Sequence, residues 1–240
     1  MSIEKLKEWI TTSDNIVFFG GAGVSTESGI PDFRGEEGIF KTESEYGVRP
    51  ETILSHSFFV RNKEIFFEYY KKHLLYSDAK PNAAHYALAE LERQGKLKAV
   101  ITQNIDDLHQ KAGSKIVLEL HGTLYRNYCT KCGAIYDLKY VQNSKGITKC
   151  EKCSGIVRPD VVLYEESLDE EVMNKAVEYI SKADVLIVGG TSLNVYPAAG
   201  LINYYRGKKL VLINKSTTSF DNRADLCLYM NIGDVFKEII

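Results

Sequence analysis

The chain has little that would direct it to a membrane, to nucleic acid or out of the cell. None of its apolar runs approaches the ~20 residues of a membrane-spanning helix, and its 30 basic residues are outnumbered by 32 acidic ones. Without an excess of positive charge, it lacks the electrostatic field on which binding to nucleic acid or anionic lipid generally rests. Its opening, MSIEKLKEWI, has neither the apolar core nor the cleavage site of a signal peptide. We therefore expect a cytoplasmic protein that has neither a membrane nor a nucleic acid as partner.

The sequence also lacks the standard motif of a nicotinamide-dependent dehydrogenase. Gly21-x-Gly23 follows an apolar run, but Thr26 stands where G-x-G-x-x-G places its third glycine. No acidic residue ends a second strand about 20 residues later, where that motif binds the ribose. A simple hydride-transferring dehydrogenase is therefore disfavoured.

What the sequence does contain is a glycine-rich turn at the end of an apolar run. Residues 16–19 are apolar and run into GGAG at 20–23, which is typical of a buried parallel strand that stops at a tight turn. Glycines there leave no side chain between backbone and ligand, and the first N–H groups of a following helix can face a phosphate. The turn alone leaves two interpretations open, a dinucleotide site and a structurally idle turn. The next segment holds Asp32, Phe33 and Arg34 between a proline and a glycine, so we expect a loop there.

Cysteine is scarce, and four of the five cysteines form two close pairs. Cys129-x-x-Cys132 and Cys150-x-x-Cys153 are separated by 17 residues. In a reducing compartment such pairs indicate a metal site before disulfides, and two C-x-x-C turns can close a tetrahedral S₄ site for one zinc ion. Four protein ligands leave no open coordination position, so the expected role of the zinc is structural. The fifth, Cys227, lies in an apolar stretch and is expected to pack as a small hydrophobic residue.

Apolar strand-like runs alternate with helical patterns along the chain. Strands are expected at 16–19, 98–102, 117–120, 161–164, 185–188, 210–213 and near 226–230. Helices are expected at 2–12, 57–76, 83–94, 168–182 (with Ser167 and Glu170 as a capping box) and 197–206. This order predicts an α/β fold, a Rossmann-like doubly wound parallel sheet with a small inserted zinc-ribbon module. The expected division assigns 1–124 and 159–240 to the nucleotide-binding domain and 125–158 to the zinc module, with 36–80 completing the small domain.

Polar residues gather where the expected strands end. In a doubly wound sheet, ligands bind outside the carboxyl ends of the strands. The segments that this rule brings to one crevice are Gly21–Ala22, Gln103–Asp106, His121, Gly190–Ser192 and Asn214.

Several motifs in fixed order resemble the sirtuins, the NAD-dependent protein lysine deacylases. They are GAGVSTESGIPDFRG, TQNIDDLHQKAG at 102–113, HG at 121–122, the paired cysteines, GTSLNVYPAA at 190–199 and LINK at 212–215. The resemblance spans residues 16–232 and is nearest to bacterial and archaeal sirtuins that consist of a single catalytic core.

The resemblance implies NAD as co-substrate and one structural Zn²⁺. By it, the catalytic residues are His121, Asn104 and Arg34. The residues that contact NAD are Gly21, Ala22, Thr26, Phe33, Arg34, Gln103, Ile105, Asp106, Gly190, Thr191, Ser192, Asn214 and Ile232. Among them, Phe33 and Arg34 flank the nicotinamide ribose, while Ile105 and Asp106 bind nicotinamide.

In the family, the acyl oxygen of acetyl-lysine attacks C1′ of the nicotinamide ribose, nicotinamide leaves, and a histidine base drives transfer of the acyl group to ADP-ribose. His121 matches that base, and a neutral imidazole can take a proton near neutral pH. The resemblance also implies an acetylated protein substrate whose chain adds as a strand between two segments. The residues of these segments are Val161, Val162, Leu163, Tyr164, Leu193, Asn194 and Val195.

Two departures from the family pattern bear on specificity. Tyr164-Glu165-Glu166 stands where the family often has Phe-Gly-Glu. With the acids at 169–171, these glutamates predict an acidic patch at the peptide cleft and a preference for substrates with Lys or Arg near the acyl-lysine. Sirtuins that prefer succinyl or malonyl groups carry Tyr-x-x-Arg where this chain has Phe67 and Tyr70, so acetyl or longer apolar acyl groups are expected.

Two alternatives to deacylation stay open. One is mono-ADP-ribosyl transfer, which shares the NAD site and the base. The other is a non-catalytic zinc protein that senses NAD. His85 and His109 also fall in family motifs, but on helical segments, and we expect both to be structural.

Overall fold

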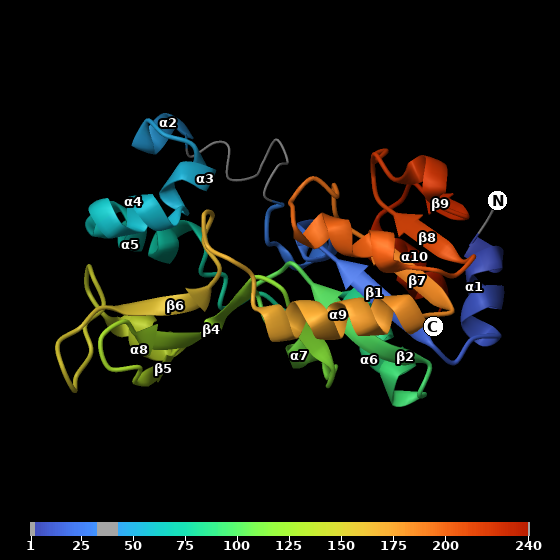
Figure 1. Cartoon of the computed structure of the whole chain (residues 1–240), viewed down its shortest axis with the longest axis horizontal. Helices are drawn as coiled ribbons and strands as arrows, with labels where there is room; N and C mark the ends of the chain where they lie inside the picture. The colour runs from blue at the N-terminus through green and yellow to red at the C-terminus, as the bar shows by residue number, and fades with distance from the viewer. Residues whose placement is uncertain (1–2, 33–42, 240) are drawn as a thin grey trace.

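The computed structural model describes residues 3–32 and 43–239, which form two sheets with their helices (Figure 1). The larger sheet is parallel and six-stranded, in the order β3-β2-β1-β7-β8-β9. Its strands are β1 (Ile16–Gly20), β2 (Leu97–Thr102), β3 (Val117–Glu119), β7 (Val185–Gly189), β8 (Leu210–Ile213) and β9 (Leu226–Leu228). From β1 the next strands along the chain, β2 and β3, extend the sheet to one side, whereas β7, β8 and β9 extend it to the other. The boundary between β1 and β7 is therefore the switch point where doubly wound sheets bind ligands. The predicted doubly wound sheet is therefore confirmed.

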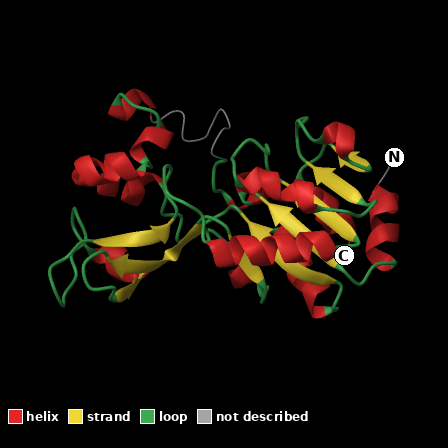
Figure 2. Ribbon diagram, in the orientation of Figure 1, coloured by secondary structure: helices red, strands yellow, loops and turns green. Residues whose placement is uncertain are grey.

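Both faces of this sheet are covered, as its continuous apolar strands require. Ile16 and Phe18 of β1 belong to a core on one face, whereas Val17 and Phe19 belong to a core on the other. The first core is covered by α1 (Ile3–Thr11), α6 (Ala83–Arg93) and α10 (Ile232–Ile239), and the second by α9 (Glu170–Lys182) and the 3₁₀ helix η4 (Ala198–Tyr204). Figure 2 shows these helices (red) around the strands (yellow). Four short elements complete this part: α7 (Leu108–Ala112), which packs on α6, and the 3₁₀ helices η1 (Ala22–Val24), η2 (Thr26–Ser28) and η5 (Asp221–Arg223).

The smaller sheet is antiparallel, in the order β5-β4-β6, and packs against a group of short helices. Its elements are β4 (Gly122–Cys129), β5 (Ile135–Asp137), α8 (Leu138–Asn143) and β6 (Val157–Val161), with α2 (Glu43–Tyr46), α3 (Pro50–Ile53), α4 (His56–Arg61) and α5 (Lys63–His73). One apolar core joins the aromatic residues of α4 and α5 to Cys129 and Cys150. The rings of α5 therefore serve mainly as core, as aromatic residues at helical spacing usually do.

Four local predictions were wrong. The helix expected at 57–76 divides at Asn62, whose φ of −129° and ψ of 55° are not helical. The segment expected to be a helix at 197–206 is the 3₁₀ helix η4. Asp169, rather than Ser167, caps α9 by accepting from Val172 N at 2.9 Å, so α9 begins at Glu170. The strand expected at 161–164 ends at Val161, because Tyr164 pairs with Ser55 instead.

Other local signals were confirmed. The Asn82 side chain caps α6, and Gly95 follows that helix with φ +76°, a conformation that favours glycine. Within the described residues, no helix combines the length and the apolar character that crossing a bilayer requires.

Candidate active site

The ends of β1 and β7 meet backbone against backbone at the switch point. Gly23 N donates to Gly190 O at 2.8 Å, and Gly190 has φ +61°. A Cβ at Gly190 would lie 2.4 Å from Val24 N, so only glycine fits. The turn continues into two single 3₁₀ turns, η1 and η2 (Thr26–Ser28), rather than into a longer helix.

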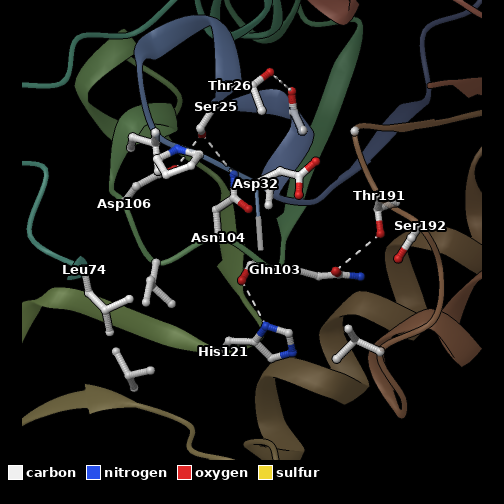
Figure 3. Close-up of a pocket in the computed structure, with 18 of the residues that line it drawn as sticks. Ser25, Thr26, Asp32, Leu74, Gln103, Asn104, Asp106, His121, Thr191 and Ser192 are labelled. Carbon is white, nitrogen blue, oxygen red and sulfur yellow. Dashed lines mark hydrogen bonds between the residues drawn. The ribbon is translucent and has the colours of Figure 1, made fainter. Parts of the chain in front are cut away.

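A hydrogen-bonded group ties this turn to the loop after β2 (Figure 3). Ser25 Oγ donates to Asp106 Oδ2 at 2.6 Å, and Asn104 Nδ2 donates to Ser25 Oγ at 3.0 Å. Leu108 N donates to the other carboxylate oxygen of Asp106 at 3.0 Å. Burial raises the pKa of Asp106, while these hydrogen bonds favour its charged form. Sequence reasoning missed Ser25; its signal was a small polar residue within an apolar, glycine-rich turn.

His121 has one ring nitrogen anchored and the other free for chemistry. Its Nδ1 lies 2.9 Å from Gln103 O. Because a carbonyl can only accept, Nδ1 carries the proton, and Nε2 keeps its lone pair. Burial lowers the pKa of His121, so the ring stays neutral near physiological pH. The next residue, Gly122, has φ +73°, and a Cβ there would lie 2.0 Å from Asp160 O, so the close β4–β6 pairing beside His121 depends on glycine.

Two buried amide groups in the crevice have donors without a partner. Gln103 Nε2 and Asn214 Nδ2 make no hydrogen bond to the described part of the chain. Asn214 Oδ1 accepts from Thr191 N at 3.0 Å, and Gln103 Oε1 lies 3.4 Å from Thr191 Oγ1, which leaves each NH₂ group free. Free buried donors are costly unless a ligand supplies acceptors. Ribose hydroxyls and phosphates are such acceptors, so these residues fit NAD.

Most of the predicted NAD residues, together with the predicted catalytic residues Asn104 and His121, line one cavity of about 870 Å³. They are Ala22, Thr26, Gln103, Asn104, Ile105, Asp106, His121, Gly190, Thr191, Ser192, Asn214 and Ile232. Gly21 lies behind the lining, where a Cβ would be 2.7 Å from Thr191 Cβ. Phe33 and Arg34 lie outside the described residues.

The predicted peptide segments face the same cavity, apart from Leu193, which is buried with φ +56°. Much of their main chain is already engaged. Leu163 N donates to Glu166 Oε2 at 2.8 Å, Tyr164 N donates to Leu54 O at 3.0 Å, and Tyr164 O accepts from His56 N at 2.9 Å. Any added strand must therefore use other main-chain groups of these walls.

Several carboxylates of the predicted acidic patch already have partners within the chain. Glu165 has φ +74°, and its carboxylate accepts from Ser57 N at 2.8 Å and Ser57 Oγ at 3.0 Å. Glu166 accepts from buried Arg158 at 2.7 and 3.0 Å and pairs with His56. Hydrogen bonds and the Arg158 charge lower the pKa of Glu166 to about 2, against the opposing effect of burial. Glu165 thus lies exposed in the cavity lining, as predicted, whereas Glu166 is paired with Arg158; the preference for Lys- or Arg-flanked substrates stays a prediction.

The end of the cavity beside α5 and the smaller sheet is apolar. Leu54, Phe66, Tyr70 and Leu124 line it, whereas Phe67 is fully buried in the aromatic core. Lys215, which follows β8, is the only Lys or Arg in the described lining. An acidic acyl chain thus finds no cation at this end within the described lining.

The four paired cysteines form a compact metal site in the smaller sheet. Their sulfur atoms all lie within 4.8 Å of one another, with Cys129–Cys153 at 3.4 Å and Cys132–Cys150 at 3.6 Å. Zn–S bonds of about 2.3 Å in a tetrahedron place the sulfurs about 3.8 Å apart. The residues therefore fit one structural zinc ion. None of the four lines the catalytic cavity.

His85 and His109 are buried with their ring centroids 4.7 Å apart, and burial lowers the pKa of both. Neither lines the cavity, in agreement with the structural role that was expected. Cys227 is half-buried and packs against the core on one face of the larger sheet, as expected for a small hydrophobic residue.

Comparisons with known proteins agree with this arrangement. A sequence model of the Sir2 family matches residues 21–197. Proteins described as NAD-dependent protein deacetylases from Clostridium perfringens and Clostridium acetobutylicum are 62% and 59% identical over 239 residues, covering 99% of this chain and 98% of theirs.

Two solved Sir2 structures cover 100% of this chain and 97% of their own. One, with a deacetylated p53 peptide and 3′-O-acetyl-ADP-ribose, has a TM-score of 0.91 at 37% identity. The other, with a p53 peptide and NAD⁺, has a TM-score of 0.88 at 36% identity. With the strand order and the crevice at the switch point, these likenesses over the whole chain establish that it belongs to the Sir2 family.

Proposed function

We propose that this chain is an NAD-dependent protein lysine deacetylase, which transfers the acetyl group of acetyl-lysine to ADP-ribose and releases nicotinamide. The observation that carries the proposal is the position of His121, a neutral imidazole with a free Nε2 in the same cavity as the glycine-rich turn. The deacetylase descriptions of its relatives support the same activity.

Different residues of the cavity bind the co-substrate and carry out catalysis. Gln103 and Asn214 offer their free amide donors to ribose and phosphate oxygens, and main-chain N–H groups around Ala22 and Thr26 donate to the pyrophosphate. Each carboxylate oxygen of Asp106 has a further lone pair for a carboxamide N–H. Phe33 and Arg34 keep the roles that the family resemblance implies.

When bound, NAD supplies the ribose carbon that receives the acyl oxygen and the nicotinamide that leaves. His121 Nε2 takes a proton from a ribose hydroxyl, and Gln103 O stabilises the resulting imidazolium through Nδ1–H. Asn104, held by Ser25, is placed to orient a ribose hydroxyl or water. The apolar end of the cavity favours neutral acyl groups over acidic ones.

The partner is an acetylated protein segment that pairs with main-chain groups of the cleft. Of the five acids at 165–171, Glu170 is the exposed one whose carboxylate has neither an ion pair nor a hydrogen bond in the described chain, so we expect it to favour Lys or Arg near the acyl-lysine. Paired thiols arranged for a metal support a reducing, cytoplasmic location. We retain 1–124 with 159–240, and 125–158 with 36–80, as the proposed domains.

The test is nicotinamide release from NAD with acetyl-, succinyl- and longer acyl-lysine peptides, for the wild type and His121→Ala. We expect release with acetyl-peptide, little with succinyl-peptide, and a loss of at least 100-fold in the variant, on the order of a general base's contribution. Undiminished acyl-dependent release in His121→Ala would refute the proposed base. Transfer of ADP-ribose to a protein acceptor, with the acetyl group retained on the peptide, would instead indicate mono-ADP-ribosyl transfer.

A further inference from the structure

The turn at 22–28 is held from three sides, and one of the holding residues lies outside the cavity. Ser25 fastens the turn to the loop of Asp106, and Glu27 Oε2 accepts from Gly233 N at 2.7 Å, at the start of α10. Both Ser25 and Glu27 line the cavity. The third contact comes from behind, from Asn82 at the start of α6, and Asn82 does not line the cavity.

The side-chain amide of Asn82 makes hydrogen bonds through both its oxygen and its NH₂ group. Its Oδ1 accepts from Ala84 N at 3.0 Å, which caps α6. Its Nδ2 donates to Val24 O at 2.7 Å and to Ser28 Oγ at 3.0 Å, one contact on each of the two 3₁₀ turns. The acceptor therefore serves the helix, and the donor serves the turn.

The orientation of Asn82 is fixed by its own helix. Asn82 N donates to His85 Nδ1 at 3.2 Å, the reciprocal bond of a capping box. His85 is fully buried and packs against His109, which lies on α7 directly after the Asp106 loop. The start of α6 is thus a rigid support shared by the glycine-rich turn and the loop that follows β2.

We propose that Asn82 is a positioning residue for the NAD site, which sets the shape of the 22–28 turn without touching the co-substrate. This inference rests on the proposed function, because it takes the turn to be where the pyrophosphate binds. A site whose amides are already oriented does not have to order the turn during binding, so the effect falls on NAD affinity. The peptide cleft and the base are elsewhere, so peptide KM and kcat should change little.

The substitution Asn82→Asp separates the effect of the amide oxygen, which caps α6, from that of the amide NH₂ group, which contacts the turn. Aspartate caps a helix about as well as asparagine, but it has no donor for Val24 O and Ser28 Oγ. We expect Asn82→Asp to raise the NAD KM, and the dissociation constant of ADP-ribose measured by calorimetry, on the order of ten-fold, as the loss of two hydrogen bonds implies. Its kcat should stay near that of the wild type, and its thermal midpoint should fall by the few degrees that the loss of two hydrogen bonds implies.

Two further variants make the test specific. Asp169→Ala removes the cap of α9, a helix that packs on the opposite face of the sheet from Val24 of the turn, so it should lower the thermal midpoint and leave the NAD KM unchanged. Ser28→Ala removes one partner of Asn82 outside the cavity, and its effect on ADP-ribose binding should be less than additive with that of Asn82→Asp.

The inference is overturned if Asn82→Asp binds ADP-ribose like the wild type, or if Asp169→Ala raises the NAD KM as much as Asn82→Asp does. It is equally overturned if the effects of Asn82→Asp and Ser28→Ala add fully. Failure of the proposed function is a separate outcome, in which the wild type binds ADP-ribose but releases no nicotinamide with any acyl-peptide. The calorimetric comparison of variants still decides the role of Asn82 in that case.

Discussion

Glu165 occupies a backbone conformation that suits glycine, and its side chain holds it there. Its φ of +74° costs a residue with a Cβ about 1–2 kcal/mol. Its carboxylate offsets this by accepting from Ser57 N and Oγ in the first turn of α4, a capping contact of about 1 kcal/mol. Two substitutions separate these contributions, because alanine loses the cap and keeps the strain, whereas glycine loses both.

We expect Glu165→Ala to be about 1 kcal/mol less stable than the wild type, and Glu165→Gly to be about 1 kcal/mol more stable than Glu165→Ala. At a site with negative φ the order of stability is reversed, because an alanine variant is about 0.4–1 kcal/mol more stable than the glycine variant. The assay is urea unfolding at pH 7.5, supported by thermal midpoints, which should differ by about 2–4 °C between the two variants.

Ser167 is the matched control, because it is exposed on the same connection and its φ is not positive. There the alanine variant should be the more stable of the pair. If Glu165→Ala equals or exceeds Glu165→Gly in stability, the reasoning from backbone strain is refuted.

Three further predictions concern the base, the metal and the specificity of the cleft. Burial lowers the pKa of His121, and catalysis needs the neutral ring. The value of kcat/KM should therefore stay constant down to about pH 6.5 and fall only below it. A pH profile of nicotinamide release that falls already between pH 8 and 7 would contradict this. Cys150→Ser should release zinc, detected with a colorimetric chelator, and lower the thermal midpoint, because the ligands share a core with α4 and α5; unchanged zinc content and stability would exclude the site. Glu170→Gln should reduce the preference for Lys- or Arg-flanked acetyl-peptides by about two- to five-fold at low salt. Glu171→Gln should not, because the Glu171 carboxylate already pairs with Lys175. Equal effects in the two variants would show that Glu170 does not determine this preference.

The sequence predicted the larger sheet well because its signals are local. Each strand is a short apolar run that ends at glycine or polar residues, and their alternation with helices implies parallel pairing. The zinc site was equally predictable, since C-x-x-C spacing itself brings thiols together. The crevice followed from the rule for strand ends, which correctly united Gln103, His121 and Asn214.

What the sequence did not predict depends on contacts between distant segments. Nothing near Tyr164 indicates that its main chain pairs with Ser55, or that Glu165 caps a helix more than a hundred residues earlier. The role of Asn82 in the turn is similar, because the capping signal is local but the contact with Val24 is not. These partners are found only once the elements have been packed together.

The strand β4 has a consequence for how this protein can vary. It begins beside His121 and ends at Cys129, and its pairing with β6 is fixed at both ends, Gly122 to Val161 and Cys129 to Val157. An insertion within either strand would shift the register on which the position of the base depends. The exposed turn near Gly146 lies between β4 and β6 in the sequence and belongs to neither strand. Evolutionary changes in length should therefore accumulate there, and the same turn offers an engineer a place to insert a reporter domain while leaving the reaction centre in register.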